Sequence, residues 1–591
     1  MHVTLIFPPH TLPLTPPVSL PLLTGFLREK GIKVKPLDLN CEALDHLLCP
    51  EVIQENYGIL LKKNLKGRGV YHRDDIIKYK QVLVSSIEQA KNTMRSKRHF
   101  YSQSKLNWSV FLIQKAFELF SLSSYPHKFT FAGSDLVIDR QGTLLSASKV
   151  PTIFDDFLKK RAVDIARSKT RLLGFSVNSF TQLLYALKLA RQIRQTCPNM
   201  HLTVGGTFLC AFKNYFKDFS PIFDLFDTVI IHEGEHALLD LVDYLRAGKP
   251  FNKCRNLIFK NNGRIQKSPL LFQEDPNSLP LPDFDGLPLG KYFVPETVVS
   301  LPLARGCYFG ACTYCGYNHN FIGRYREETV SRIVEKIRSL QKQLKTRYFI
   351  FSVSALAPVL AKELSRQLVR NKIKIHWMSQ ARAEAAFDED AFSALAKAGC
   401  RMLAFGFESA NPRILGLMNK GIMPRDQKRV LKACKKNGIQ VEVDILYNFL
   451  DEKPLELKDT LDFLYEHKSS ITYLALNDFF VAMDSPIFWD PERFGLVVSA
   501  PTASRGIIKL FNGRVKWRTY ARKNSGEEKK QKALILKDFL ANMSEEGFRK
   551  ASKKYLVNGR LTAQTNSVFN LLYSSRGSQT NEAHRPACRN P

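Results

Sequence analysis

The feature that most constrains the fold is a regular alternation of short apolar strands with amphipathic helices. In the middle third of the chain, this pattern predicts strands at 299–303, 348–353, 375–379, 402–407, 441–446 and 473–476. Helical periodicity fills the intervals, as at 329–343 and 425–437. Alternating strands and helices form parallel sheets, because each helix crosses back over the sheet. We therefore expect an α/β fold with a partial (β/α)6 TIM-like barrel here.

The N-terminal third carries a second series of the same kind. It predicts strands at 3–7, 34–39, 172–177, 202–204 and 228–231, with helices between them. Repeated strand–helix units predict a doubly wound parallel sheet with helices on both faces. A long, lysine-rich and mostly helical stretch interrupts the series, and we interpret it as an insertion.

These patterns divide the chain into five parts. We predict a Rossmann-type domain from 1–40 plus 165–265, a helical insertion at 41–164, the barrel at 295–480, a small C-terminal cap at 481–573 and a disordered tail at 574–591. The tail is rich in Ser, Asn, Arg and Gln, a composition that cannot bury enough apolar surface to fold.

Polar and small residues follow the strands of the predicted N-terminal sheet. Doubly wound sheets bind ligands at the carboxyl ends of their strands. The residues at these ends are Ser176, Gly205, Gly206, Glu233, Gly234 and Glu235. The glycines would let a flat ligand approach the backbone closely, or they serve only as turn residues.

The run from His232 to His236 matches H-E-x-x-H, the motif of zinc hydrolases. That motif needs both histidines on one helix face, with the glutamate as general base. Here His232 directly follows a predicted strand and Gly234 interrupts the motif, so we expect the helix to start near Glu235. A zinc hydrolase built on His232 and His236 is therefore the weaker alternative.

Three clustered cysteines, Cys307, Cys312 and Cys315, follow the first predicted barrel strand. Three thiolates this close together can hold three irons of a cubane iron–sulfur cluster. The nearest other cysteines along the chain are Cys254 and Cys400, so the fourth iron would stay open to a small molecule. Barrels of this type place their chemistry in the loops after the strands. We therefore predict a catalytic iron–sulfur centre.

Two later strand ends carry further candidate binding groups. Gly406, Glu408 and Ser409 end the fourth barrel strand, where a carboxylate can accept hydrogen bonds from an amine or a ribose hydroxyl. Ser409 or Asn411 also suits the N-cap of a helix that begins at Pro412. Arg382 ends the third strand, where it either pairs with a carboxylate ligand or forms a structural ion pair.

The chain has a formal net charge of +32 over 591 residues. This charge predicts either a polyanionic partner such as RNA or a lysine-rich solvated surface. The basic residues are spread along the chain rather than grouped in blocks, which favours the solvated surface. No run of about 18 apolar residues and no signal-like leader is present. Eleven cysteines suit a reducing compartment, so we expect a cytoplasmic protein without a membrane partner.

Together these residues resemble the radical S-adenosylmethionine (SAM) superfamily, in particular its members with an N-terminal cobalamin-binding domain. The three cysteines are separated by four and then two residues, a spacing found in a branch of the cobalamin-linked group. The run A-F-G-F-E-S at 404–409, followed by L-G-L-M-N-K-G at 415–421, is similar to the G-x-E-S…L…M-x-K-G region of that family.

The resemblance implies that the three cysteines hold a [4Fe–4S] cluster whose open iron binds SAM. Reduction of the cluster, by a flavodoxin or ferredoxin, would release a 5′-deoxyadenosyl radical that abstracts hydrogen from an unactivated carbon. The same resemblance implies that SAM is contacted by Tyr314, Arg382, Gly406, Glu408 and Ser409.

Cobalamin is implied at the carboxyl edge of the N-terminal sheet, on the six residues from Ser176 to Glu235 named above. The expected outcome is methylation, or another modification, of a carbon in a peptide or small metabolite, with an RNA-modifying radical enzyme as the alternative. Two departures bear on this expectation. The N-terminal region lacks the D-x-H-x-x-G motif that supplies an axial histidine to cobalt, and Asn448 with its charged neighbours replaces a glycine–proline-rich turn.

Overall fold

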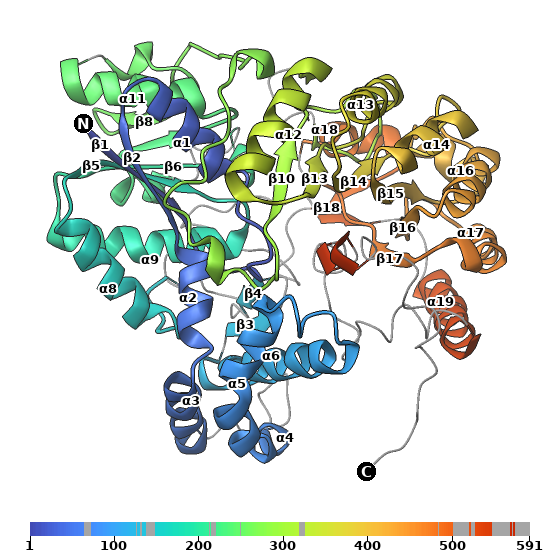
Figure 1. The fold of residues 1–591 in the computed structure, drawn as a ribbon, viewed down its shortest axis with the longest axis horizontal. Coiled ribbons are helices and arrows are strands. Elements are labelled where there is room, and N and C mark those ends of the chain that lie inside the picture. The colour runs from blue at the N-terminus through green and yellow to red at the C-terminus, as the bar shows by residue number, and fades with distance from the viewer. Residues whose placement is uncertain are drawn as a thin grey trace.

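The computed structural model describes the chain except for residues 64–72, 126, 131–132, 137–147, 212, 214–219, 249, 318–324, 483, 500–518, 522–525, 547–567, 570 and 574–591. Figure 1 shows two sheets lying side by side, with a group of helices against the first of them. The predicted tail and much of the predicted cap lie outside the described residues. Within the described part, no helix is long and apolar enough to cross a membrane.

The first sheet has seven strands in the order β2-β1-β5-β6-β7-β8-β9. Its strands are β1 (His2–Phe7), β2 (Lys33–Asp38), β5 (Thr170–Ser176), β6 (His201–Gly205), β7 (Thr228–Ile230), β8 (Leu257–Asn261) and β9 (Arg264–Lys267). The first five are parallel and confirm the predicted strands. The antiparallel pair β8 and β9 was not predicted.

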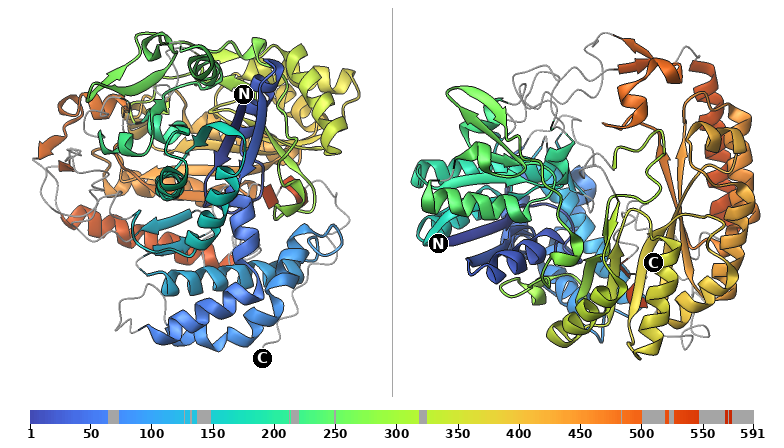
Figure 2. Two further views of the ribbon diagram at one scale, coloured as in Figure 1. Left: turned by 90° about the vertical axis from the view of Figure 1, so that its left-hand side faces the viewer. Right: turned by 90° about the horizontal axis from the view of Figure 1, so that it is seen from above.

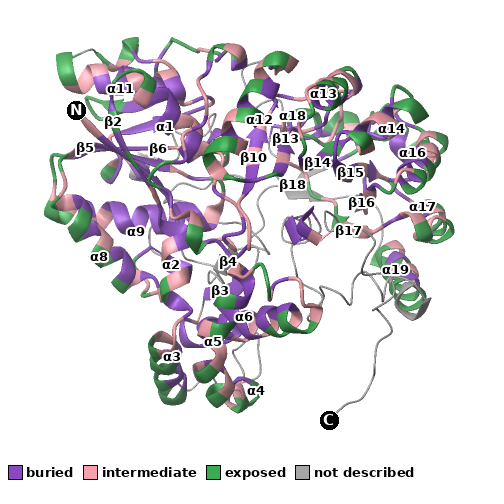
Figure 3. Ribbon diagram, viewed as in Figure 1, coloured by how far each residue is buried: buried purple, intermediate pink, exposed green. Residues whose placement is uncertain are grey.

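Helices cover both faces of this sheet. On one face, α1 (Ser19–Glu29) packs beside α11 (Glu235–Ala247), and on the other α8 (Asp155–Ala166) packs beside α9 (Phe180–Thr196). The strands read as nearly continuous apolar runs because both faces are buried, as Figure 3 shows in purple. This arrangement confirms the predicted doubly wound class.

The residues between β2 and β5 are mostly helical. They form α2 (Leu39–Leu47), α3 (Pro50–Lys62), α4 (Arg73–Lys78), α5 (Lys80–Arg95), α6 (Gln103–Ser123), the hairpin β3 (His127–Thr130) and β4 (Gly133–Leu136), and α8. Helices α3, α5 and α6 pack on one another and share a buried apolar cluster with α9.

The second sheet has six parallel strands in chain order. They are β10 (Val298–Pro302), β13 (Tyr348–Ser352), β14 (His376–Ala381), β15 (Cys400–Glu408), β16 (Gln440–Tyr447) and β17 (Tyr473–Asp478). All six confirm the predicted strands. The connecting helices are α12 (Val330–Leu344), α13 (Pro358–Arg370), α14 (Glu389–Lys397), α15 (Pro412–Leu417), α16 (Pro424–Lys436) and α17 (Pro454–Glu466).

These helices lie along one face of the second sheet, so its other face turns toward the first sheet (Figure 2). The C-terminal helix α19 (Gly526–Glu546) packs on α17. A shorter segment returns to the interior, where Val568, Phe569, Leu571 and Leu572 are fully buried in the cluster that also holds α6.

Candidate functional site

The three cysteines lie in a loop that leaves the second sheet after β10. The loop begins at β11 (Ala304–Arg305) and ends at β12 (Arg326–Glu327), and these two short strands pair antiparallel. Contacts to the segment after α15 hold the loop in place. The backbone N–H of Thr313 donates to the carbonyl of Met418 (2.9 Å), and the Asn419 amide donates to the carbonyl of Ala311 (2.9 Å).

The thiols suit a cluster with one open iron. Cys307 and Cys312 are half-buried and Cys315 is exposed, whereas Cys254 and Cys400 are buried. A cubane distributes its thiolates over separate irons, so its cysteines lie farther apart than the ligands of a single ion. Among the described residues, no three His, Cys, Asp or Glu side chains converge as the ligands of one metal ion do. Three thiols in one loop, none of them fully buried, are the donor set for a [4Fe–4S] cluster with one open iron.

Arg382 places a buried positive charge beside the cysteines. It follows β14, is 4% exposed, and its Nη1 lies 4.0 Å from the Sγ of Cys312. Its guanidinium stacks 3.6 Å above the ring of Phe309 and donates to the carbonyl of Lys420. A fixed cation at this distance stabilises thiolates and an anionic cluster. The structure therefore brings Arg382 to the site.

Three side chains form a closed triangle next to the cysteine loop. The Tyr314 hydroxyl donates to Glu408 Oε1 (3.0 Å), and Lys420 Nζ donates to both the same oxygen (3.0 Å) and the tyrosine hydroxyl (3.0 Å). Burial and the Glu408 charge raise the pKa of Tyr314, so the phenol stays protonated. Glu408 thus keeps one carboxylate oxygen, Oε2, outside the triangle.

The end of β15 is shaped to aim this carboxylate. Glu408 has a φ of 64°, and the β15–β16 register shifts between Gly406 and Glu408. Such a bulge re-aims a side chain near a site. A Cβ on Gly406 would lie 2.6 Å from Glu408 Oε1 and 3.1 Å from Lys420 Nζ, so only glycine leaves room for the pair.

Ser409 does not join this group. It is 1% exposed, and its hydroxyl shares a hydrogen bond with Thr460 (2.9 Å) and accepts one from the Asn411 N–H (3.1 Å). Ser409 lies just beyond the end of β15, after the left-handed backbone of Glu408. The N-cap of α15 is Asn411, whose side chain accepts from the N–H groups of Arg413 and Ile414. Ser409 therefore accepts a hydrogen bond from the N-cap residue but is not itself the N-cap.

Sequence reasoning missed two members of the group. Lys420 was noticed only as part of a motif, and Asp444 was not singled out. Asp444 pairs with Gly406 in the sheet register, and burial and the nearby Glu408 raise its pKa to about 6 against the opposing effect of Lys420. Asp444 does not stand out in the sequence, because Gln440 and Glu442 occupy the preceding alternate positions of the same strand.

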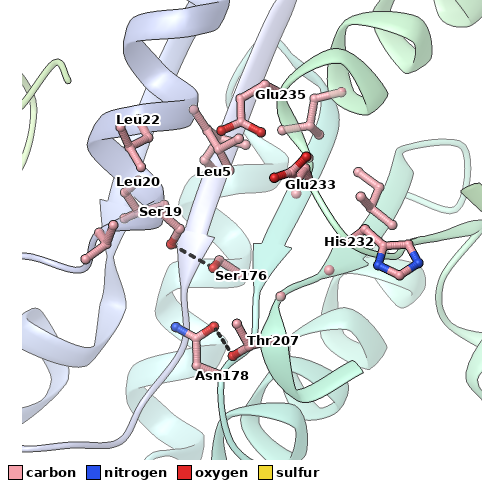
Figure 4. Close-up of a pocket in the computed structure, with 18 of the residues that line it drawn as sticks. Leu5, Ser19, Leu20, Leu22, Ser176, Asn178, Thr207, His232, Glu233 and Glu235 are labelled. Atoms are coloured by element: carbon pink, nitrogen blue, oxygen red, sulfur yellow. Dashed lines mark hydrogen bonds between the residues drawn. The ribbon is translucent and has the colours of Figure 1, made fainter. Parts of the chain in front are cut away.

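A pocket of about 330 Å³ opens at the carboxyl edge of the first sheet (Figure 4). All six residues predicted there line it: Ser176, Gly205, Gly206, Glu233, Gly234 and Glu235. An apolar wall is added by Leu5, Leu20, Leu22, Leu23, Phe175 and Leu238. The second sheet contributes Pro302 and Ser352, and the loop after its first strand contributes Ala304, Arg305 and Tyr317. The pocket is therefore shared between the two sheets and reaches the cysteine loop.

The polar groups of the pocket are few. Ser176 donates to the Ser19 hydroxyl (2.7 Å), and Thr207 donates to the Asn178 amide oxygen (3.2 Å), as drawn in Figure 4. Gly206 has a φ of +117°, and a Cβ there would lie 2.2 Å from the carbonyl of Val177. The turn itself therefore requires that glycine, while a mostly apolar wall with scattered hydroxyls suits a large flat ligand.

The carboxylates of Glu233 and Glu235 already have a charged partner within the protein. Both are buried and form ion pairs with Arg305. Burial would raise the pKa of Glu235, but the charge of Arg305 and its hydrogen bonds hold that pKa below its usual value.

The two histidines of the H-E-x-x-H run do not share a helix. Helix α11 starts at Glu235, as expected, and His232 has a φ of 61° in the turn before it. His236 instead bonds through Nδ1 to Glu274 Oε2 (2.6 Å) and packs against the rings of Phe26 and Phe272. The geometry that zinc hydrolases require is absent from this run.

Residues 301–464 match the family model of the radical SAM superfamily. The chain contains a radical SAM domain. An uncharacterized methyltransferase of Pyrococcus horikoshii is 29% identical over 282 residues, covering 47% of this chain and 59% of the relative. The anaerobic magnesium-protoporphyrin IX monomethyl ester cyclase of Rubrivivax gelatinosus is 25% identical, covering 46% and 50%. The chain thus spans between half and 59% of the length of these curated relatives.

Solved structures share the fold beyond the radical SAM domain. The methyltransferase TsrM of Kitasatospora setae, solved with cobalamin and a [4Fe–4S] cluster, matches with a TM-score of 0.55 at 16% identity, covering 85% of this chain and 79% of TsrM. The cobalamin-dependent enzyme OxsB matches with a TM-score of 0.53 at 16% identity, covering 74% and 69%. These likenesses confirm the predicted fold class.

Proposed function

We propose that this radical SAM protein holds a [4Fe–4S] cluster on Cys307, Cys312 and Cys315, cleaves SAM reductively, and binds cobalamin in the shared pocket. The reaction we propose is methylation of a carbon in a peptide or small metabolite, with electrons supplied by a flavodoxin or ferredoxin. The observation that carries this proposal is the shared pocket, because its lining includes Tyr317, two residues beyond Cys315. A ligand held there lies against the cysteine loop.

The chain's own residues account for SAM binding and charge balance. A bound cluster supplies one electron to the sulfonium of SAM, which breaks a carbon–sulfur bond. Arg382 balances the negative charge of the cluster, and its stacking on Phe309 fixes it in place. Glu408 Oε2 and Asp444 lie on neighbouring strands and can accept hydrogen bonds from the amino group and ribose hydroxyls of SAM. Lys420 orients the Glu408 carboxylate through an ion pair of 3.0 Å.

The case for cobalamin rests on the shape and chemistry of the pocket. Its apolar wall suits the face of a large ring, and its hydroxyl and amide groups suit the polar edge. TsrM and OxsB share the fold, and both are described as cobalamin-bound. Residues predicted from the resemblance line the pocket together, although they come from three separate strand ends.

The proposal is tested by anaerobic reconstitution of the full chain with iron and sulfide, followed by SAM and a titanium(III) reductant. We expect methionine and 5′-deoxyadenosine as products. Cys312→Ala should abolish the formation of both products. The control is Cys49→Ala, at a free cysteine between α2 and α3, which should leave the formation of both products unchanged. Undiminished cleavage by Cys312→Ala would refute the cysteine assignment.

A further inference from the structure

The cysteine loop is closed at its base by a pair of arginines. Strands β11 and β12 place Arg305 directly opposite Arg326 in the antiparallel register. Their side chains are only 13% and 17% exposed. Like charges directly opposite one another destabilise a strand pair, and partial burial strengthens the repulsion. The stem of the loop therefore needs an anion between the two guanidinium groups.

Glu233 supplies that anion from the other sheet. Its carboxylate is 2% exposed, and its Oε1 lies 3.0 Å from Arg305 Nη1 and 2.8 Å from Arg326 Nη2. Its Oε2 accepts from Arg326 Nη1 (3.1 Å) and from the backbone N–H of Glu274 (2.7 Å). Glu235 forms a further ion pair with Arg305, so the two positive charges are matched by two negative charges. Two buried cations thus meet two buried carboxylates.

This network joins the cysteine loop to the wall of the pocket. Arg305 stands two residues before Cys307, and it lines the pocket together with Glu233 and Glu235. The backbone of Glu274 anchors both partners to the chain after β9, because its N–H donates to the Glu233 carboxylate and its carbonyl accepts from Arg326. A change in the pocket wall must therefore move the stem of the loop.

We propose that Glu233 is a positioning residue that clamps the stem of the cysteine loop to the pocket wall, so that the cluster and a corrin in the pocket stabilise each other. The clamp concerns the cluster loop alone, whereas the mutual stabilisation rests on the proposed function. Coupling between two sites is reciprocal, so either ligand should bind more tightly when the other is present.

Iron release tests the clamp without any pocket ligand. The reconstituted full chain is mixed anaerobically with the chelator ferrozine, and the rate of iron loss is followed by absorbance. Glu233→Gln leaves two buried arginines sharing one carboxylate, so we expect iron loss to be at least about tenfold faster. The matched control is Glu327→Gln, which removes an exposed carboxylate from the same stem and should leave the rate unchanged.

A charge-balanced variant covers the case in which Glu233→Gln folds poorly. Glu233→Gln combined with Arg326→Gln removes one charge of each sign and leaves the Arg305–Glu235 pair intact. We expect it to recover most of the iron retention of the parent chain. Iron loss from Glu233→Gln at the parent rate, or a double variant that is worse than the single one, would overturn the clamp.

Binding of hydroxocobalamin tests the coupling. Its dissociation constant is measured by absorbance titration of the chain with and without the cluster. We expect about fivefold tighter binding or more with the cluster, and no difference in Glu233→Gln. Equal affinities in the parent chain would overturn the coupling. Failure of the parent chain to bind hydroxocobalamin at all would instead refute the cobalamin part of the proposed function, and the iron-release comparison would still decide the clamp.

Discussion

Asp444 is a carboxylic acid held where its charge is unfavourable. Burial and the neighbouring Glu408 raise its pKa to about 6, against about 3.9 in an unfolded chain. The folded state therefore binds this proton more tightly than the unfolded state, and the penalty of ionised Asp444 grows as the pH rises from about 4 to 6. Placing an acid here makes sense only if a ligand donates hydrogen bonds to it.

Because folding raises the pKa of Asp444, the effect of Asp444→Asn on stability should depend on pH. In the cluster-free chain at pH 7.5, the variant should be more stable, by at most about 3 kcal/mol. The gain should fall to less than about 1 kcal/mol near pH 4, where folded Asp444 is protonated and unfolded Asp444 is about half protonated. Melting temperatures of both proteins at the two pH values measure this. A gain of equal size at both pH values would contradict the electrostatic explanation.

Gly406 tests the geometry of the Glu408 triangle. In Gly406→Ala, the new Cβ would lie 2.6 Å from Glu408 Oε1, so the carboxylate must move. We expect SAM affinity to fall at least about tenfold, the size of one lost charge-assisted hydrogen bond. The control is Gly416→Ala on α15, where a Cβ meets nothing within 4 Å and affinity should be retained. Equilibrium binding of SAM to the reconstituted chain decides between the outcomes.

At this scale the sequence located the strand ends but not the direction of each side chain. Glu408 and Ser409 are adjacent in the sequence, yet only Glu408 reaches the site, because the strand ends in a bulge with Glu408 at positive φ and Ser409 instead bonds to Thr460. Lys420 and Asp444 come from other segments, and only the folded sheet brings them to Glu408.

At the scale of elements, the alternation of apolar strands and helices predicted the six parallel strands of the second sheet and the five of the first. Periodicity was sufficient because the central strands are largely buried on both faces, as in β5 and β15, and helices separate the strands along the chain. The hairpin of β8 and β9 was missed because its exposed strand is short and polar. The Asn262–Gly263 turn, with both residues at positive φ, was the available signal.

The short C-terminal segment is an element that no local pattern could place. Phe569 is fully buried and packs edge-on against Phe100 of the helical region, with ring centroids 5.5 Å apart. Phe569→Ala should therefore lower the free energy of unfolding by about 3–5 kcal/mol. Phe480→Ala, at a side chain that is 75% exposed, is the matched control and should change it little. Denaturant unfolding measures both, and equal small effects would show that the segment is not part of the core.

At the scale of the whole molecule, two sheets with separate sequence signatures share one pocket. The first sheet supplies the apolar wall and the glutamates, and the second supplies Arg305 and Tyr317 next to the cysteines. Neither sequence signature predicted the ion pairs that Arg305 and Arg326 form with the two glutamates. About 70 to 90 residues separate each arginine from its carboxylate partner in the sequence. In the proposed function, this shared pocket would place cobalamin next to the residues that bind SAM.

The central claim is that this chain holds a cluster on three cysteines beside a corrin in the shared pocket. Elemental analysis of protein purified anaerobically from cobalamin-fed cells tests it most directly. We expect four irons and one cobalt per chain, and a Cys312→Ala variant that loses the irons while keeping bound cobalt. Iron that persists in Cys312→Ala, or a parent chain with neither iron nor cobalt, would contradict the account.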